Sequence, residues 1–251
     1  MILLLGITEN EYGQFTQKTQ ARNRSSCTLS VGSDPLSPAR IYKARHDVPN
    51  EDALLLIDEG PRTLLAIADS HFGHEASHNL LQQFSTLATP IPDNPLAALD
   101  YLRESRPFFD SPSETTLLLA ILDRSCNQVF GYSFGDSSLV CLDPTDPPRQ
   151  INEHNSCFLS PSHPDSFDPR LAREFSTSVH PGDLLLAYSD GVDACHYNHP
   201  ETSITLAHIH RLYQGHPHPA PILEALTELA LQGVPPNPGG QDNIATICTR
   251  V

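Results

Sequence analysis

The sequence predicts an α+β fold in which two antiparallel β-sheets pack on each other and helices lie outside them. Strand-like apolar runs follow one another without the regular strand–helix alternation of a parallel α/β fold. Paired helical segments interrupt these runs twice, and the chain returns to a strand at its end. A length of 251 residues suffices for one substantial core, so we expect a single domain over residues 1–251.

The first half of the chain contains a predicted hairpin. Residues 1–40 are hard to assign, and we expect a loose N-terminal arm followed by a first strand at 27–31. The continuous apolar run 53–58 predicts a buried strand, and the run 63–69 predicts its partner across a Glu-Gly-Pro turn. Because hairpin strands are antiparallel, the start of the first strand should lie beside the end of the second.

Helical spacing over 74–87 predicts an amphipathic helix, and a second helix is expected at 96–103 after a proline-rich break. The Pro- and Ser-rich segment 144–169 predicts a surface excursion, because strands resume after it. The remaining predicted elements are strands at 115–123, 128–134, 138–143, 175–179, 184–188 and 244–251, and helices at 203–213 and 221–231.

Composition limits the class of partner. The net charge of −15 and the pI near 5.1 argue against nucleic acid and anionic membranes as partners, because no basic patch can be assembled. The apolar residues 1–7 have no basic flank and are too few for a signal peptide or a membrane span, so we expect a cytoplasmic protein. Six scattered cysteines without a CxxC pair predict reduced thiols.

Three aspartates share one local pattern. Asp69 and Asp190 each end an apolar strand, and Asp242 follows a glycine pair just before the closing strand. The acidic pair Glu51-Asp52 opens the strand that we expect beside Asp69. Each motif alone also fits an ordinary turn or helix cap. Together they predict a site for a hard divalent cation, which prefers oxygen ligands and is bound by a few carboxylates.

The order of these motifs resembles that of the metal-dependent serine/threonine protein phosphatases, the PPM or type 2C family. The resemblance extends from about residue 50 to the C-terminus, and residues 179–192 are most similar to the bacterial branch. It implies an α-β-β-α sandwich with two Mn²⁺ or Mg²⁺ ions between the sheets. The motifs that carry it are Asn50-Glu51-Asp52, Asp69-Ser70-His71-Phe72-Gly73-His74-Glu75, Gly135-Asp136-Ser137, Ser189-Asp190-Gly191 and Gly240-Gln241-Asp242-Asn243.

The resemblance also implies roles for individual residues. Asp69 would bridge both metals, and Ser70 would offer its backbone carbonyl. One metal would be held by Asp190 and Asp242, and the other by Glu51 or Asp52, directly or through water. Asp136 matches the place where some members bind a third, weaker metal. His71 matches the general acid that protonates the leaving Ser or Thr oxygen.

The implied activity is hydrolysis of phosphoserine and phosphothreonine in a phosphorylated protein substrate, in signal transduction. Two cations roughly 3.5–4 Å apart lower the pKa of a bridging water, which attacks phosphorus in line. We expect a monomer that binds neither nucleic acid nor membrane.

The sequence departs from the family pattern at three places. Phe72 stands in the turn that is usually formed by Gly-His-Gly-Gly, and Ser138 replaces the Arg that often follows Gly-Asp-Ser. The phosphate-binding Arg of the family falls on Asp47 here, so Arg45 or Lys43 would have to reach the phosphate instead. Substrate binding is therefore less well predicted than metal binding.

Two other functions remain open on the sequence alone. His74-Glu75-Ala76-Ser77-His78 fits the HExxH pattern of zinc proteases, although a chance match is credible in a chain with 13 histidines. A non-catalytic module of the same fold that binds a phosphoprotein is the other alternative. Degenerate modules of this kind typically lose metal-ligand carboxylates, and Asp69, Asp190 and Asp242 are all retained here.

Overall fold

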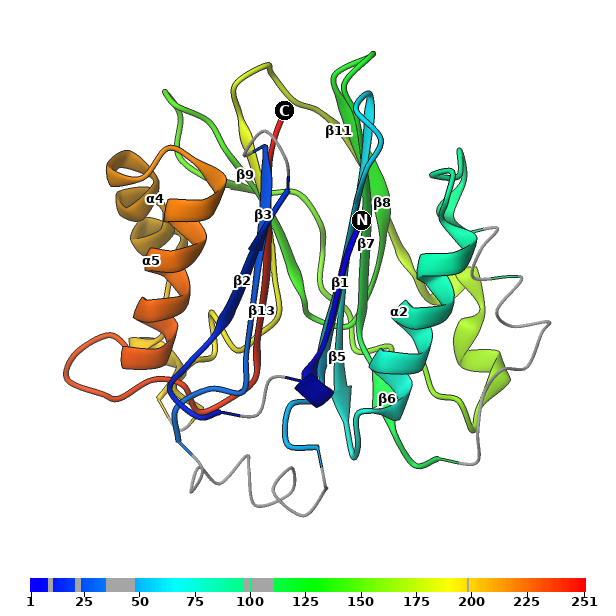
Figure 1. The fold of residues 1–251 in the computed structure, drawn as a ribbon, viewed down its shortest axis with the longest axis horizontal. Coiled ribbons are helices and arrows are strands. Elements are labelled where there is room, and N and C mark those ends of the chain that lie inside the picture. Colours follow the sequence, from blue (N-terminus) through cyan, green and yellow to red (C-terminus); the bar gives the residue numbers. More distant parts are fainter. Residues whose placement is uncertain (9–10, 21–23, 35–47, 97–99, 101–110, 198) are drawn as a thin grey trace.

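The apolar runs of the chain form two antiparallel sheets that face each other (Figure 1). The computed structural model describes the chain except residues 9–10, 21–23, 35–47, 97–99, 101–110 and 198. The first sheet has the order β1 (Ile2–Leu5), β4 (Asp52–Asp58), β5 (Arg62–His71), β7 (Leu117–Asp123), β8 (Gln128–Phe134) and β11 (Arg173–Ser178), and the short β6 (Glu114–Thr115) pairs with the end of β5.

The second sheet is built mainly from the C-terminal half of the chain. Its order is β10 (Arg149–Gln150), β9 (Ser138–Leu142), β12 (Leu184–Tyr188), β13 (Ile244–Arg250), β3 (Ser25–Ser30) and β2 (Thr16–Thr19). Helix α2 (Glu75–Leu87) covers the outer face of the first sheet, while α4 (Leu206–Gly215) and α5 (Pro219–Gln232) cover the outer face of the second (Figure 1). The predicted α+β sandwich of two antiparallel sheets with outer helices is confirmed.

Successive side chains along each strand point to opposite faces of the sheet, and both faces are covered. On β4, Leu54 and Leu56 point into the core between the sheets, and Leu55 and Ile57 point toward α2. All four side chains are buried, as expected for a strand that is covered on both faces. The continuous apolar runs that predicted buried strands are therefore the central strands of the two sheets.

The N-terminal arm was incorrectly predicted in part. Residues 2–5 form the edge strand β1 beside β4, and residues 16–19 form β2 beside β3. Both are four-residue edge strands whose pairing depends on distant parts of the chain, which local sequence patterns do not reveal. The predicted first strand near Cys27 is confirmed as β3.

The helix boundaries differ by a few residues from those predicted. α4 begins at Leu206 because Thr205 caps it together with His208, and α5 begins earlier than predicted because Pro219 occupies its first turn. The predicted helix at 96–103 lies largely outside the described residues. No helix in the described part of the chain is long and apolar enough to cross a membrane.

Candidate active site

The hairpin β4–β5 places three acidic residues at one end of the first sheet. Asp52 and Asp69 are register partners across the two strands, and Glu51 immediately precedes β4. All three are buried, with Asp69 only 2% exposed. Thr116 holds the backbone of Asp69 from the neighbouring strand: its hydroxyl accepts the Asp69 N–H, and its own N–H donates to the Asp69 carbonyl. The antiparallel pairing thus fixes the acidic side chains side by side, as the hairpin predicted.

The second sheet brings its own carboxylates to the same end. Asp190 follows β12 and Asp242 precedes β13, and these strands are antiparallel neighbours with Tyr188 opposite Thr246. Asp136 lies in the turn between β8 and β9. Since β9 is the other neighbour of β12, this turn belongs to the same end of the sheet.

Two hydrogen-bonded side chains join the sheets at this end. The Ser189 hydroxyl donates to Asp52 Oδ2 at 2.7 Å and accepts the Ala245 N–H. The Asn243 side-chain oxygen accepts the Glu51 N–H at 2.9 Å, and its amide nitrogen donates to the carbonyl of Val31. The two bonds between the sheets, Ser189–Asp52 and Asn243–Glu51, connect residues 137 and 192 positions apart in the chain.

The electrostatics of the site centre on Asp190. Its pKa is raised well above the ordinary value, first by burial of its carboxyl and then by the charges of Asp69 and Asp242. A hydrogen bond to Asp69 and the charge of Asp136 act in the same direction. Asp190 Oδ1 is buried and has no hydrogen-bond partner among the described residues. Carboxylates gathered in this way repel one another unless a proton or a cation lies between them.

A further carboxyl extends this acidic region. Burial and the charge of Asp136 raise the pKa of Asp193 to about 7. The site therefore carries at least two carboxyls whose ionised forms are disfavoured in the metal-free protein. Cation binding would reverse this, because a nearby positive charge favours the ionised carboxylate.

The predicted general acid, His71, is the last residue of β5 and pairs with Glu114 of β6. His71 Nδ1 lies 3.8 Å from Glu114 Oε1, and the ring of Phe158 is 5.1 Å from the His71 ring. The N–H of Gly73 donates to Glu51 Oε1 at 2.8 Å, which fastens the loop after β5 to the acidic pair. Gly73 has φ +130°, a backbone conformation that residues with a side chain rarely adopt, so the turn favours glycine.

Ser70 connects the site to the first turn of α2. Its hydroxyl accepts the N–H of Ser77, and the Ser77 hydroxyl donates to the carbonyl of Glu51. The side chain of Ser70 therefore supports the helix start. The expected role of the Ser70 backbone carbonyl as a metal ligand stays a prediction.

Several residues that organise the site were not predicted. Ser189 and Asn243 lie inside recognised motifs, but their sequence positions do not show that they bridge the sheets. Thr116 and Glu114 come from the short segment that pairs with β5, and the predicted strand at 115–123 was the only signal for it. Arg45 and Lys43, the proposed phosphate ligands, lie outside the described residues.

The zinc-protease alternative does not fit the structure. His78 is buried, its Nε2 accepts the N–H of Gly6 at 3.0 Å, and its ring also hydrogen-bonds the backbone of Asp52. Burial, followed by the charge of His74, lowers the pKa of His78 to about 4. Because Nε2 accepts a backbone N–H, that nitrogen offers no lone pair to zinc, and His78 acts as a structural residue.

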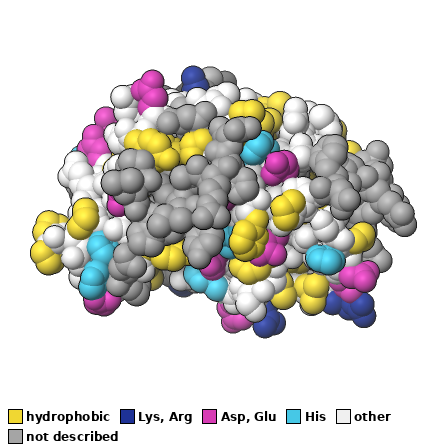
Figure 2. All heavy atoms as spheres, turned by 90° about the horizontal axis from the view of Figure 1, so that it is seen from below, with side chains coloured by type: hydrophobic (Ala, Val, Ile, Leu, Met, Phe, Trp, Pro, Cys, Tyr) yellow, Lys and Arg dark blue, Asp and Glu magenta, His cyan; other side chains and the backbone are white. Residues whose placement is uncertain are grey.

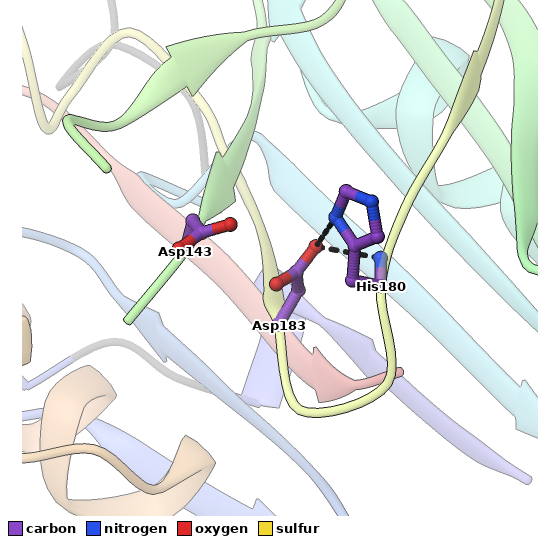
Figure 3. Close-up of side chains that lie close together, drawn as sticks. All are labelled: Asp143, His180 and Asp183. Atoms are coloured by element: carbon purple, nitrogen blue, oxygen red, sulfur yellow. Dashed lines mark hydrogen bonds and ion pairs between the residues drawn. The ribbon is translucent and has the colours of Figure 1, made fainter. Parts of the chain in front are cut away.

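A second group of possible metal ligands lies at the opposite end of the second sheet (Figure 3). The ligand atoms of Asp143, His180 and Asp183 lie within 4.8 Å of one another. Each acid has a structural role there: Asp183 Oδ2 accepts the His180 N–H at 2.8 Å, and Asp143 Oδ1 accepts the N–H of Thr145 at 2.7 Å. These are turn-stabilising bonds.

Figure 2 shows the end of the molecule at which β5 finishes and α2 begins. Carboxylate, histidine and hydrophobic side chains lie close together on this face. The face therefore combines acidic, titratable and apolar groups.

Comparisons with known proteins agree with this architecture. No family model matches the sequence, and no curated protein matches it by sequence. Solved structures do match: PppA, a key regulatory component of T6SS in Pseudomonas aeruginosa, has 22% identity, a TM-score of 0.64, and coverage of 90% of this chain and 96% of its own.

Two metal-bound structures are also similar. The catalytic domain of the serine threonine protein phosphatase PstP with two manganese ions has 18% identity and a TM-score of 0.61, covering 94% of this chain and 99% of its own. RsbX in complex with magnesium has 10% identity and a TM-score of 0.62, with the same coverage. The chain therefore has the fold of the bacterial PPM serine/threonine phosphatases, the family that its motifs resemble.

Proposed function

We propose that the chain is a Mn²⁺- or Mg²⁺-dependent phosphatase that hydrolyses phosphoserine and phosphothreonine in proteins. The observation that carries the proposal is the convergence of Asp69, Asp190 and Asp242 at one end of the sandwich, with an unpartnered buried oxygen on Asp190. The fold of the metal-bound phosphatases that resemble the chain supports the same activity.

The acidic site suits hard cations. Its donors are carboxylate oxygens, which Mn²⁺ and Mg²⁺ prefer, and the raised pKa of Asp190 reflects a surplus of negative charge. Asp69, Asp190 and Asp242 would hold the ions, with Glu51 or Asp52 on the side of the first sheet and Asp136 at a third, weaker position. Bound ions would neutralise phosphoryl oxygens and make a water molecule acidic enough to act as nucleophile at neutral pH.

The chain's own residues then supply binding and proton transfer. His71 would protonate the leaving serine or threonine oxygen, and Glu114 Oε1, 3.8 Å from Nδ1, would help to orient the ring. The Gly73–Glu51 hydrogen bond fixes the loop that directly follows His71 relative to the carboxylates. Ser189 orients the Asp52 carboxylate by donating a hydrogen bond to Oδ2.

The test is phosphate release from a phosphothreonine peptide. We expect EDTA-treated protein to be inactive, Mn²⁺ or Mg²⁺ to restore turnover, and Asp69→Asn and Asp242→Asn each to reduce kcat/KM by a factor of about 100 or more. Asp143→Asn, an acid at the opposite end of the sheet, is the matched control and should leave turnover unchanged. Metal-independent turnover, or full activity in both site variants, would refute the proposal. Phosphopeptide binding without turnover would support the non-catalytic alternative.

A further inference from the structure

Phe72 has an unusual backbone conformation beside the proposed general acid. Its φ is +63°, in the left-handed region that side chains larger than Asn or Asp rarely adopt. Its side chain is nevertheless 55% exposed, so burial in this chain's own core does not account for the strained backbone. Residues held in sparsely populated φ/ψ regions cluster at active sites and ligand clamps.

Two aromatic rings, those of Phe72 and Phe158, lie near the ring of His71. The His71 ring meets the Phe72 ring edge-on, with centroids 6.2 Å apart, and the half-buried Phe158 lies 5.1 Å from His71. Phe158 comes from a distant segment that is fixed in place, because Leu159 and Thr115 exchange two backbone hydrogen bonds of 2.8 and 2.9 Å. The His71 ring thus lies near two aromatic rings from different segments, Phe72 and Phe158.

Negatively charged side chains lie near the rings of Phe72, His71 and Phe158. Glu114 lies against His71 with its side chain 34% exposed, and Glu75 follows the loop at the start of α2. Acidic groups on a substrate, other than the phosphate itself, would be repelled here. An apolar group would instead cover the Phe72 ring and remove it from water.

We propose that Phe72 and Phe158 determine substrate specificity by binding a large apolar side chain, aromatic or aliphatic, that adjoins the phosphorylated serine or threonine. The inference rests on the proposed function, since it takes His71 to lie at the reacting phosphate ester. Phe72 contacts the flanking side chain with its exposed ring. Phe158, 5.1 Å from the His71 ring, adds a second apolar ring beside the proposed general acid.

The experiment compares four phosphothreonine peptides that differ only in the flanking residue: Leu, Phe, Gly or Asp. For the wild type, kcat/KM should be roughly 5- to 20-fold higher with Leu or Phe than with Gly, and lowest with Asp. Phe72→Gly should remove this preference, so that kcat/KM becomes nearly equal for the Leu-, Phe- and Gly-flanked peptides, while Phe72→Leu should retain most of it. Leu171→Ala, which removes another exposed apolar side chain (42% exposed), is the matched control and should change nothing.

Glycine accepts a positive φ without strain, so Phe72→Gly should fold at least as well as the wild type, and unfolding does not confound the comparison.

A binding measurement separates this inference from the proposed function. Peptides carrying a non-hydrolysable phosphonate in place of the phosphate are titrated by fluorescence anisotropy, with the same four flanking residues.

Each outcome decides the inference. Turnover that is independent of the flanking residue, with Phe72→Gly indistinguishable from wild type, would overturn it and leave the phosphatase assignment standing. Absence of turnover together with apolar-selective binding that Phe72→Gly abolishes would support the aromatic contact and overturn the enzyme assignment. Absence of both turnover and selectivity would overturn both.

Discussion

Replacing Asp190 by Asn tests the charge balance of the site in the metal-free and metal-bound protein. Burial and the neighbouring Asp69 and Asp242 raise the pKa of the Asp190 carboxyl in the folded state. A carboxyl whose folded pKa is raised binds more protons in the folded than in the unfolded chain. Metal-free stability should therefore fall as the pH rises from about 4 through the raised folded pKa.

The size of the effect follows from the repulsion that Asn removes. Two like unit charges about 4 Å apart interact by about 4 kcal/mol at an effective dielectric constant of about 20, and proton uptake relieves part of this. We expect metal-free Asp190→Asn to be more stable than wild type by about 1–3 kcal/mol at pH 7.5. For a chain of this length, this corresponds to a rise in Tm of about 3–9 °C.

Metal should stabilise the wild type much more than the variant. Mn²⁺ at about 100 times its Kd should stabilise the wild type by about 2.7 kcal/mol, whereas Asp190→Asn, having lost a ligand, should respond little at the same concentration. Thermal unfolding of EDTA-treated protein, followed with and without Mn²⁺, measures both effects. Asp143→Asn is the control and should behave as wild type. The reasoning is refuted if Asp190→Asn is destabilised without metal, or if Asp143→Asn rather than Asp190→Asn loses the Mn²⁺ response.

Three further predictions concern stability. Ser189→Ala leaves Asp52 and the Ala245 N–H without their buried partner and should cost about 1–3 kcal/mol in urea unfolding; a loss below 0.5 kcal/mol would show that the bridge between the sheets is unimportant. His78 has a folded pKa lowered to about 4, so the unfolded chain binds more protons between about pH 4 and 6.5, and stability is lost as pH falls through this range. The wild type should lose about 2–3 kcal/mol more than His78→Gln over that range, and equal pH profiles would contradict the assignment. Phe72→Gly should gain about 1 kcal/mol in the same unfolding assay because it relieves a left-handed backbone, whereas a loss would show that the ring stabilises the fold.

The sequence predicted the parts of the site that depend on neighbouring strands. The apolar runs on either side of the Glu59-Gly60-Pro61 turn were enough to place Asp69 beside Asp52, because the register of a hairpin follows from its turn. The position of Asp190 near Asp69 depends instead on how the two sheets pack. For that, only the order of the motifs gave an indication.

Other features depend on long-range pairing that no local pattern reveals. The Ser189–Asp52 and Asn243–Glu51 hydrogen bonds join segments more than 130 residues apart, and β6, which carries Glu114, is only two residues long. The edge strands β1 and β2 also depend on pairing with distant parts of the chain. Phe72 was recognised as a departure from the motif, but its positive φ and its exposure are properties of the folded chain.

The most direct test of the account is an anomalous-diffraction measurement on crystals soaked in Mn²⁺. We expect anomalous peaks among the carboxylates of Asp69, Asp190 and Asp242. Glu51 or Asp52 should lie next to a peak on the side of the first sheet. Peaks confined to the Asp143–His180–Asp183 group, or an empty acidic site at millimolar Mn²⁺, would contradict it.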